Sequence, residues 1–127
     1  MIEFQIELTD QPGQLAAVTE VIASGGANIL GAAAIGKARP AVALVVDNES
    51  ATVAALDKFG AKYSTNELLL HTLEHRPGAL AEFTRKIANA GINLNSFYIM
   101  HTEESTAEIA FTVDNVELVS EMFEISS

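Results

Sequence analysis

The residues best suited to chemistry lie in a short polar turn that occurs twice in the chain. Residues 10–15 read Asp-Gln-Pro-Gly-Gln-Leu, and residues 75–80 read His-Arg-Pro-Gly-Ala-Leu. In each copy the Pro-Gly pair precedes apolar residues at helical spacing, which predicts an open helix N-terminus with the proline at its first position. Unpaired N–H groups and the positive end of the helix dipole suit a ligand carboxylate there. The sequence therefore predicts a carboxylate-binding turn in each half.

The side chains near the two turns differ in ways that matter for an amino-acid ligand. Gly13 and Gly78 have no Cβ, so a ligand is expected to approach the backbone closely. Asn28 carries both a donor and an acceptor and is expected near the first turn, where Asp10 could receive an ammonium group. In the second copy His75 stands in place of that carboxylate. The first copy is therefore the better candidate site.

Each of these features also has a structural interpretation. Taken alone, a Pro-Gly turn before a helix favours a structural role over a binding role by about four to one. Asn28 and Asn93 have an even chance of simply bonding local backbone at a strand start. His71 aligns with Ile6 on the core face of a strand, which favours a structural histidine. The complete set of candidate ligand-binding residues is Asp10, Gln11, Gly13, Gln14, Leu15, Asn28, Ile29, His75, Arg76, Gly78, Ala79, Leu80, Asn93 and Leu94.

The elements that position these turns also repeat. Residues 12–28 return as residues 77–93, so the chain is a duplicated unit with units expected at 1–66 and 67–127. Apolar and polar residues alternate over 2–9, which predicts a strand, and apolar runs after each helix predict a hairpin. A second helix follows in each copy, with Ser50 expected as the cap of the first of these.

The resulting order predicts an α+β fold of two ferredoxin-like βαββαβ units, with antiparallel sheets and helices on one face. Residues 62–65 are expected to form the closing strand of the first unit. The second unit is expected to lack a full closing strand. That would leave a sheet edge to be paired or covered, so a homodimer is expected.

The repeated turns, together with Gly-Ala-Asn at 26–28 and Gly-Ile-Asn at 91–93, resemble the signature of the ACT domain family. The resemblance covers essentially the whole chain and implies a regulatory protein that binds a free amino acid or related small carboxylate at an interface between units. It further implies an enzyme of amino-acid biosynthesis as a partner, since aspartokinase, prephenate dehydratase and phosphoglycerate dehydrogenase carry similar modules. The alternative is a scaffold or oligomerisation subunit that binds no ligand.

The composition of the chain disfavours several other classes of function. Seven Lys and Arg against seventeen Asp and Glu give a formal net charge of −10, which disfavours nucleic acid and anionic membranes as partners. The chain has no cysteine, and its His, Asp and Glu residues show no metal-ligand spacing. No nucleophile-base pair or pair of acids repeats with the motif, so we expect neither an enzyme nor a cofactor. With no signal peptide or membrane span in the sequence, the cytoplasm is the expected location.

Overall fold

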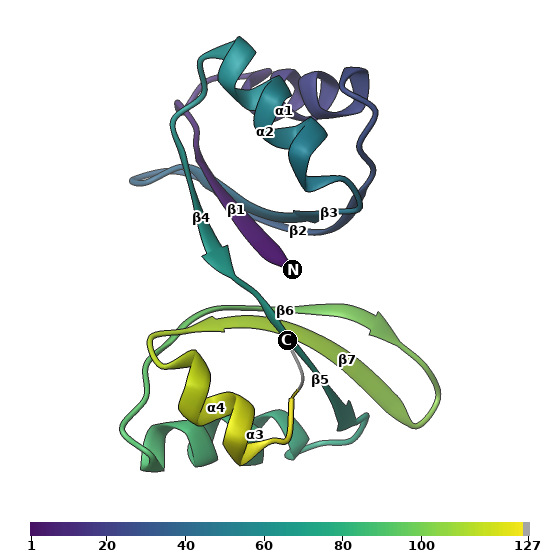
Figure 1. Cartoon of the computed structure of the whole chain (residues 1–127), viewed down its shortest axis with the longest axis vertical. Coiled ribbons are helices and arrows are strands. Elements are labelled where there is room, and N and C mark those ends of the chain that lie inside the picture. Colours follow the sequence, from purple (N-terminus) through teal and green to yellow (C-terminus); the bar gives the residue numbers. More distant parts are fainter. Residues whose placement is uncertain (126–127) are drawn as a thin grey trace. The chain divides into compact units, whose positions relative to one another are not determined.

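The computed structural model describes residues 1–125, which form two compact units. One unit comprises Ile2–Asn66, and the other comprises the residues from Glu67 onward together with Met1. Each unit has its own sheet, its own pair of helices and its own hydrophobic core (Figure 1).

The first unit follows the order strand, helix, strand, strand, helix, strand. Its sheet has the strand order β2-β3-β1-β4, and β3 pairs antiparallel with both β1 and β2. The helices α1 and α2 lie on the same face of this sheet (Figure 1). The elements are β1 (Ile2–Glu7), α1 (Gln14–Ser24), β2 (Ile29–Ile35), β3 (Ala41–Val46), α2 (Glu49–Phe59) and β4 (Tyr63–Glu67).

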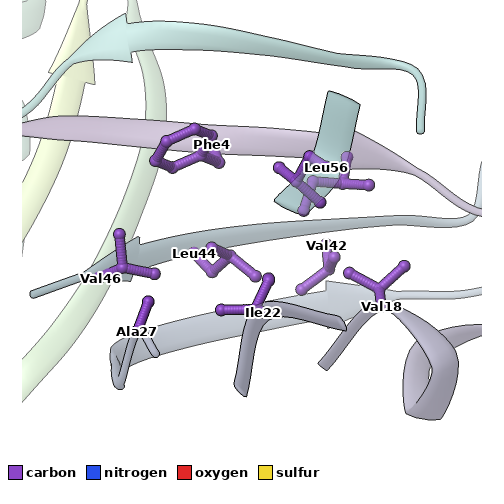
Figure 2. Close-up of a cluster of buried hydrophobic side chains, with 9 residues drawn as sticks. Phe4, Val18, Ile22, Ala27, Val42, Leu44, Val46 and Leu56 are labelled. Carbon is purple, nitrogen blue, oxygen red and sulfur yellow. The ribbon is translucent and has the colours of Figure 1, made fainter. Parts of the chain in front are cut away.

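Alternation along the strands explains why the helices cover one face. Phe4 and Ile6 of β1 point to the same side as Leu44 of β3, and all three are fully buried. Val18 and Ile22, one helical turn apart on α1, close over this layer, and Leu56 joins them from α2 (Figure 2). The core therefore fixes α1 against the sheet and with it the position of the first polar turn.

The second unit repeats this pattern over three strands. Its sheet has the order β5-β7-β6, with both pairs antiparallel, and α3 and α4 lie on one face of it (Figure 1). The α+β class, the ferredoxin-like order and the shorter second sheet predicted from the sequence are thereby confirmed. The elements are β5 (Leu69–Glu74), α3 (Ala79–Asn89), β6 (Leu94–Thr102), β7 (Thr106–Val113) and α4 (Val116–Met122).

Three predicted helix starts are wrong in detail. The N-caps of α1 and α3 are Gly13 and Gly78, so Pro12 and Pro77 lie outside these helices rather than at their first positions. The cap of α2 is Asn48, whose side chain accepts a hydrogen bond from the Ala51 N–H at 3.1 Å, and not Ser50. Asn48 is the cap because it directly precedes the first helical residue, where its side-chain oxygen can accept from an N–H of the first turn.

Candidate functional site

The first polar turn is built around a glycine in the left-handed conformation. Gly13 has φ of 89° and precedes the first residue of α1. The Ala17 N–H donates to the Gly13 carbonyl at 2.9 Å, which starts the helix. Among the described residues, no side chain caps the first turn of α1. The Gln14 N–H donates to the Gln11 carbonyl at 3.4 Å, and no side chain of the described residues caps the N–H groups of Leu15 and Ala16.

Space around the turn is open. A Cβ added to Gly13 would meet no atom within 4 Å, so backbone conformation, rather than close contact inside the unit, explains the glycine. Asp10 and Gln11 are exposed, and Leu15 is 41% exposed. The Gln14 side chain folds back and accepts a weak hydrogen bond from the Thr9 N–H at 3.4 Å. The structure thus brings together five predicted site residues in one exposed turn: Asp10, Gln11, Gly13, Gln14 and Leu15.

Asn28 does not join that turn, and the expectation that it lies beside Gly13 is wrong for a single unit. α1 has 11 residues and is therefore about 16 Å long. Gly13 precedes this helix and Asn28 follows it, so the two lie at opposite ends of the sheet. Ile29 packs against the first hydrophobic core and is not available to a ligand at the turn. One amino acid cannot touch Gly13 and Asn28 of the same unit.

Asn28 instead takes part in a backbone clamp that repeats in the second unit. Its N–H donates to Asp47 Oδ1 at 2.8 Å, and its carbonyl accepts from the Asp47 N–H at 3.1 Å. Asn93 and Asp114 form the same pair at 3.1 and 3.2 Å. These contacts tie the start of one hairpin strand to the end of the other. The recurrence of Asp47 at Asp114 was visible in the sequence, but nothing there showed what the carboxylate bonds.

The clamp leaves the asparagine side chains in different states. The Asn28 side chain is exposed, whereas Asn93 Nδ2 donates to Asn95 Oδ1 at 2.8 Å. Like Asn28, Asn93 follows its helix while Gly78 precedes it, so the expected proximity to the turn fails here too. Leu94 packs against the second core and cannot reach the turn.

The second turn has the same backbone as the first but carries a charged network. Gly78 has φ of 91° and is the N-cap residue of α3, with no side-chain hydrogen bond to the first turn. The Arg76 guanidinium donates to Glu82 in the first turn of α3 at 2.8 Å, to Glu74 and to the Pro77 carbonyl. These contacts raise the pKa of Arg76, and Arg76 holds the pKa of Glu82 below its usual range. An arginine with acidic partners thus already occupies the neighbourhood of the second helix start.

The remaining predicted residues of the second turn differ in their exposure to solvent. The exposed His75 donates its N–H to the Ser105 carbonyl at 2.9 Å, which extends the sheet. Ala79 is buried, and Leu80 is 41% exposed, like Leu15 in the first unit. The turn therefore gathers His75, Arg76, Gly78 and Leu80, but the Arg76 side chain already bonds Glu74, Glu82 and the Pro77 carbonyl. The sequence showed the charges without showing these pairings.

Within residues 1–125, no group of three or more His, Asp or Glu side chains is placed to hold a metal ion. No helix in the described part of the chain is long and apolar enough to cross a membrane.

Comparisons with known proteins agree with this geometry. Residues 68–119 match the family model of the ACT domain, which confirms the resemblance for the second unit. A structure from Bacteroides thetaiotaomicron superposes with a TM-score of 0.82 at 19% identity, covering 98% of this chain and 89% of that one. No curated protein matches the sequence.

Two further structures are regulatory subunits of aspartate kinase. The one from Thermus thermophilus has a TM-score of 0.66 at 18% identity, and the one from Thermus flavus has 0.70 at 17%. Each comparison covers 97% of this chain and 85% of the other. At this identity the likeness establishes a shared fold over nearly the whole chain.

Proposed function

We propose that this chain, with an ACT domain in its second unit, is a regulatory protein of amino-acid metabolism that binds a free amino acid at the turn before α1. The observation that carries the proposal is the exposed helix start after Gly13, which has no capping side chain among the described residues. Leu15 and Ala16 offer main-chain N–H groups to the ligand carboxylate. Asp10, exposed on the same turn, offers its carboxylate to the ligand ammonium.

The ligand class follows from these two groups. A carboxylate and an ammonium on one carbon are common to all amino acids, so the turn selects the class rather than one member. Asn28 contributes to such a site only when another unit brings its own Asn28 to the turn, because the two lie at opposite ends of α1. A composite site of this kind is consistent with a homodimer, which we include in the proposal.

A thermal-shift screen of the twenty amino acids tests this function directly. A ligand present at 100 times its dissociation constant adds about 2.7 kcal/mol of stability. Gly13 is a poor position for a test substitution, because any side chain there is strained at φ of 89°. Asp10→Ala is a better choice, since the side chain is exposed and the turn backbone does not depend on it.

The expected result is a loss of affinity without a loss of folding. Removing a charge-assisted hydrogen bond of about 1.5–3 kcal/mol raises the dissociation constant at least roughly tenfold. Calorimetry of Asp10→Ala should show this change, while Glu20→Ala, an exposed carboxylate further along α1, should bind like the unchanged protein. Equal affinities for both variants would remove Asp10 from the site.

A scaffold that binds no ligand is the second candidate, and the Arg76 network favours it for the second unit. Arg76 bonds Glu74 and Glu82 beside the start of α3, so that turn is already supplied with charge. In this case the chain would assemble with an enzyme of amino-acid biosynthesis, as the names of the aspartate kinase subunits suggest for their own chains. Failure of all twenty amino acids to bind, with an altered activity of such an enzyme on mixing, would favour the scaffold.

A further inference from the structure

The helix α1 carries few charges for a helix on the surface. Only one of its 11 residues, Glu20, is charged. The equivalent helix α3 also has 11 residues and carries Glu82, Arg85 and Lys86. The two helices belong to the same repeat and both follow a glycine cap, so α3 shows how this repeat looks when its outer face is solvated. A helix that is apolar on most of its circumference is typically covered by another element.

The difference between the two helices is concentrated on one stripe of α1. Ala17 and Val21 stand where α3 has Glu82 and Lys86, at the repeat offset of sixty-five residues. Positions four apart are neighbours on one face of a helix. Glu82 and Lys86 are exposed in the second unit, whereas Ala17 and Val21 are half-buried at a groove between α1 and α2. The first unit therefore has an apolar stripe where the second unit has charges.

This α1–α2 groove has a volume of about 600 Å³ and lies within the first unit. The helices pack closely at one end of the groove, since a Cβ added to Gly25 would lie 3.1 Å from Ala55 Cβ. At the other end the Phe59 side chain stays exposed, with 46% of its surface accessible. The groove thus presents apolar carbon from both helices to the outside of the chain, and such a surface is suited to contact with another protein.

Two opposite charges line the groove, one on each helix. Glu20 of α1 and Lys58 of α2 are both exposed, and neither has an ionic partner among residues 1–125. Gly25, after the end of α1, lies beside Ala51 and Ala55 in the first half of α2, so the helices run antiparallel. Moving the same number of residues back along α1 and forward along α2 brings Glu20 level with Lys58. The residues that line the groove thus carry no net charge, in a chain whose formal net charge is −10.

We propose that a second copy of this chain covers the α1–α2 groove with its own α1 and α2. Two copies related by a two-fold axis use the same surface twice, so the surface must complement itself. An axis parallel to the helices places α1 of each copy over α2 of the other, and therefore Glu20 of each copy opposite Lys58 of the other. An axis perpendicular to the helices in the same plane would oppose Glu20 to Glu20 and Lys58 to Lys58. Charge complementarity selects the first arrangement.

This contact is separate from the ligand site proposed above. With the axis parallel to α1, both copies of this helix run in the same direction, so Asn28 of the second copy stays at the end opposite to the turn before α1. Gly13 and the exposed residues 10–11 lie outside the groove. The contact thus leaves the turn open to a ligand and contributes no residue to it. Its test is a measurement of association, and ligand binding at the turn is tested independently.

Charge reversal tests the pairing of Glu20 with Lys58. Glu20→Lys turns both symmetry-related pairs into like-charge pairs, and so does Lys58→Glu, so each variant should raise the dimer dissociation constant roughly tenfold. The double variant Glu20→Lys/Lys58→Glu restores opposite charges and should regain most of the lost affinity. Sedimentation equilibrium measures all three. Arg85→Glu is the matched control, because it reverses an exposed charge at the position of α3 equivalent to Glu20 and should leave association unchanged.

A further substitution tests the apolar stripe. Val21→Lys installs the residue that α3 carries at the equivalent position, Lys86, so the variant is expected to fold, which circular dichroism checks. A lysine in the groove would lose hydration on contact, so this variant should be monomeric at micromolar concentrations where the unchanged protein is a dimer. A monomeric unchanged protein would overturn the proposal and leave the groove to a helix of a different protein. Single charge variants that associate like the unchanged protein would also overturn it, as would a double variant that associates no better than either single one.

Discussion

At the scale of single residues, the two polar turns depend on the backbone conformation of their glycines. Gly13 and Gly78 have φ of 89° and 91°, and each immediately precedes a helix. Residues with a Cβ rarely adopt this region, and forcing one there costs about 1–2 kcal/mol. Their repetition is thus explained by local geometry, whether or not both turns bind a ligand.

Gly13→Ala should lower the free energy of unfolding by about 1 kcal/mol, because its Cβ meets no neighbour and only the positive φ is strained. Gly36→Ala is the matched control, since Gly36 is also free of neighbours but has no positive φ. Urea denaturation measures both. A loss of stability in Gly36→Ala as large as that in Gly13→Ala would contradict the explanation.

His71 should make stability depend on pH. Burial between Phe83 and Phe123 and the nearby charge of Lys86 lower its pKa below the usual 6.5. The folded state therefore binds this proton less readily than the unfolded state, so its contribution is fully present above pH 6.5 and is lost as the pH falls from that value toward the lowered pKa.

The test is His71→Ile, which installs the residue that the first unit carries at the equivalent position, Ile6. The stability of the variant relative to the unchanged protein should rise as the pH falls from about 7.5 to 5. Glu74, Glu82 and Glu124 line the surface groove beside His71, together with Arg76. A pH-independent stability difference for His71→Ile would show that these carboxylates let the folded protein hold the protonated ring.

At the scale of elements, the N-cap of the second helix in each unit is an asparagine. Asn48 Oδ1 accepts from the Ala51 N–H, and Asn115 Oδ1 accepts from the Leu118 N–H, both at 3.1 Å. Ser50 is the cap expected from the sequence, but its hydroxyl donates to Asn48 Oδ1 instead of accepting from a helix N–H. The cap is therefore part of the repeat.

Asn48→Ala should destabilise the first unit by about 1 kcal/mol, as loss of an N-cap usually does. Ser50→Ala should have a distinctly smaller effect, because the Ala51 N–H keeps its partner. Thermal unfolding of the two variants separates the alternatives. If Ser50→Ala proved the more damaging change, the cap assignment would be wrong.

The sequence predicts elements better than it predicts contacts between them. Alternation from Ile2 to Thr9 and the repeated helix pattern were enough for the order of elements along the chain and for the fold class. The separation of Gly13 from Asn28 required the helix length and the direction of α1 across the sheet. The Arg76 network and the Asp47 clamp depend on side-chain geometry, which residue spacing does not determine.

At the scale of the whole molecule, each unit is organised around a separate core. Leu44 is fully buried in the first, and Phe111 is fully buried in the second. Each unit has about half of the chain, and domains of roughly 60 residues are only marginally stable. A substitution that weakens the packing of one core should therefore increase local unfolding mainly in the unit that contains that core.

Leu44→Ala removes a fully buried side chain and should cost about 2–5 kcal/mol. Hydrogen exchange should rise more in residues 2–66 than in the second unit. Phe111→Ala, the reciprocal variant, should give the opposite distribution. An equal rise across both units in each variant would show that they unfold as one body.

The paired hairpins indicate where the chain tolerates added length. Strand β6 is offset from β2 by sixty-five positions, as Phe97 opposes Phe111 where Ala32 opposes Leu44, whereas β7 is offset from β3 by sixty-seven. The pairs from Ile29–Val46 to Ala34–Val42 all recur in the second hairpin, and a register shift between Ile99 and His101 follows them, so the two extra residues were accommodated toward the hairpin tip. Pro40 must stay unchanged, because its carbonyl accepts from the Leu8 N–H at 3.0 Å beside the ligand turn. A fluorophore or affinity tag placed between Gly36 and Arg39 should therefore leave the core and this hydrogen bond intact, which gives a labelling position for binding measurements.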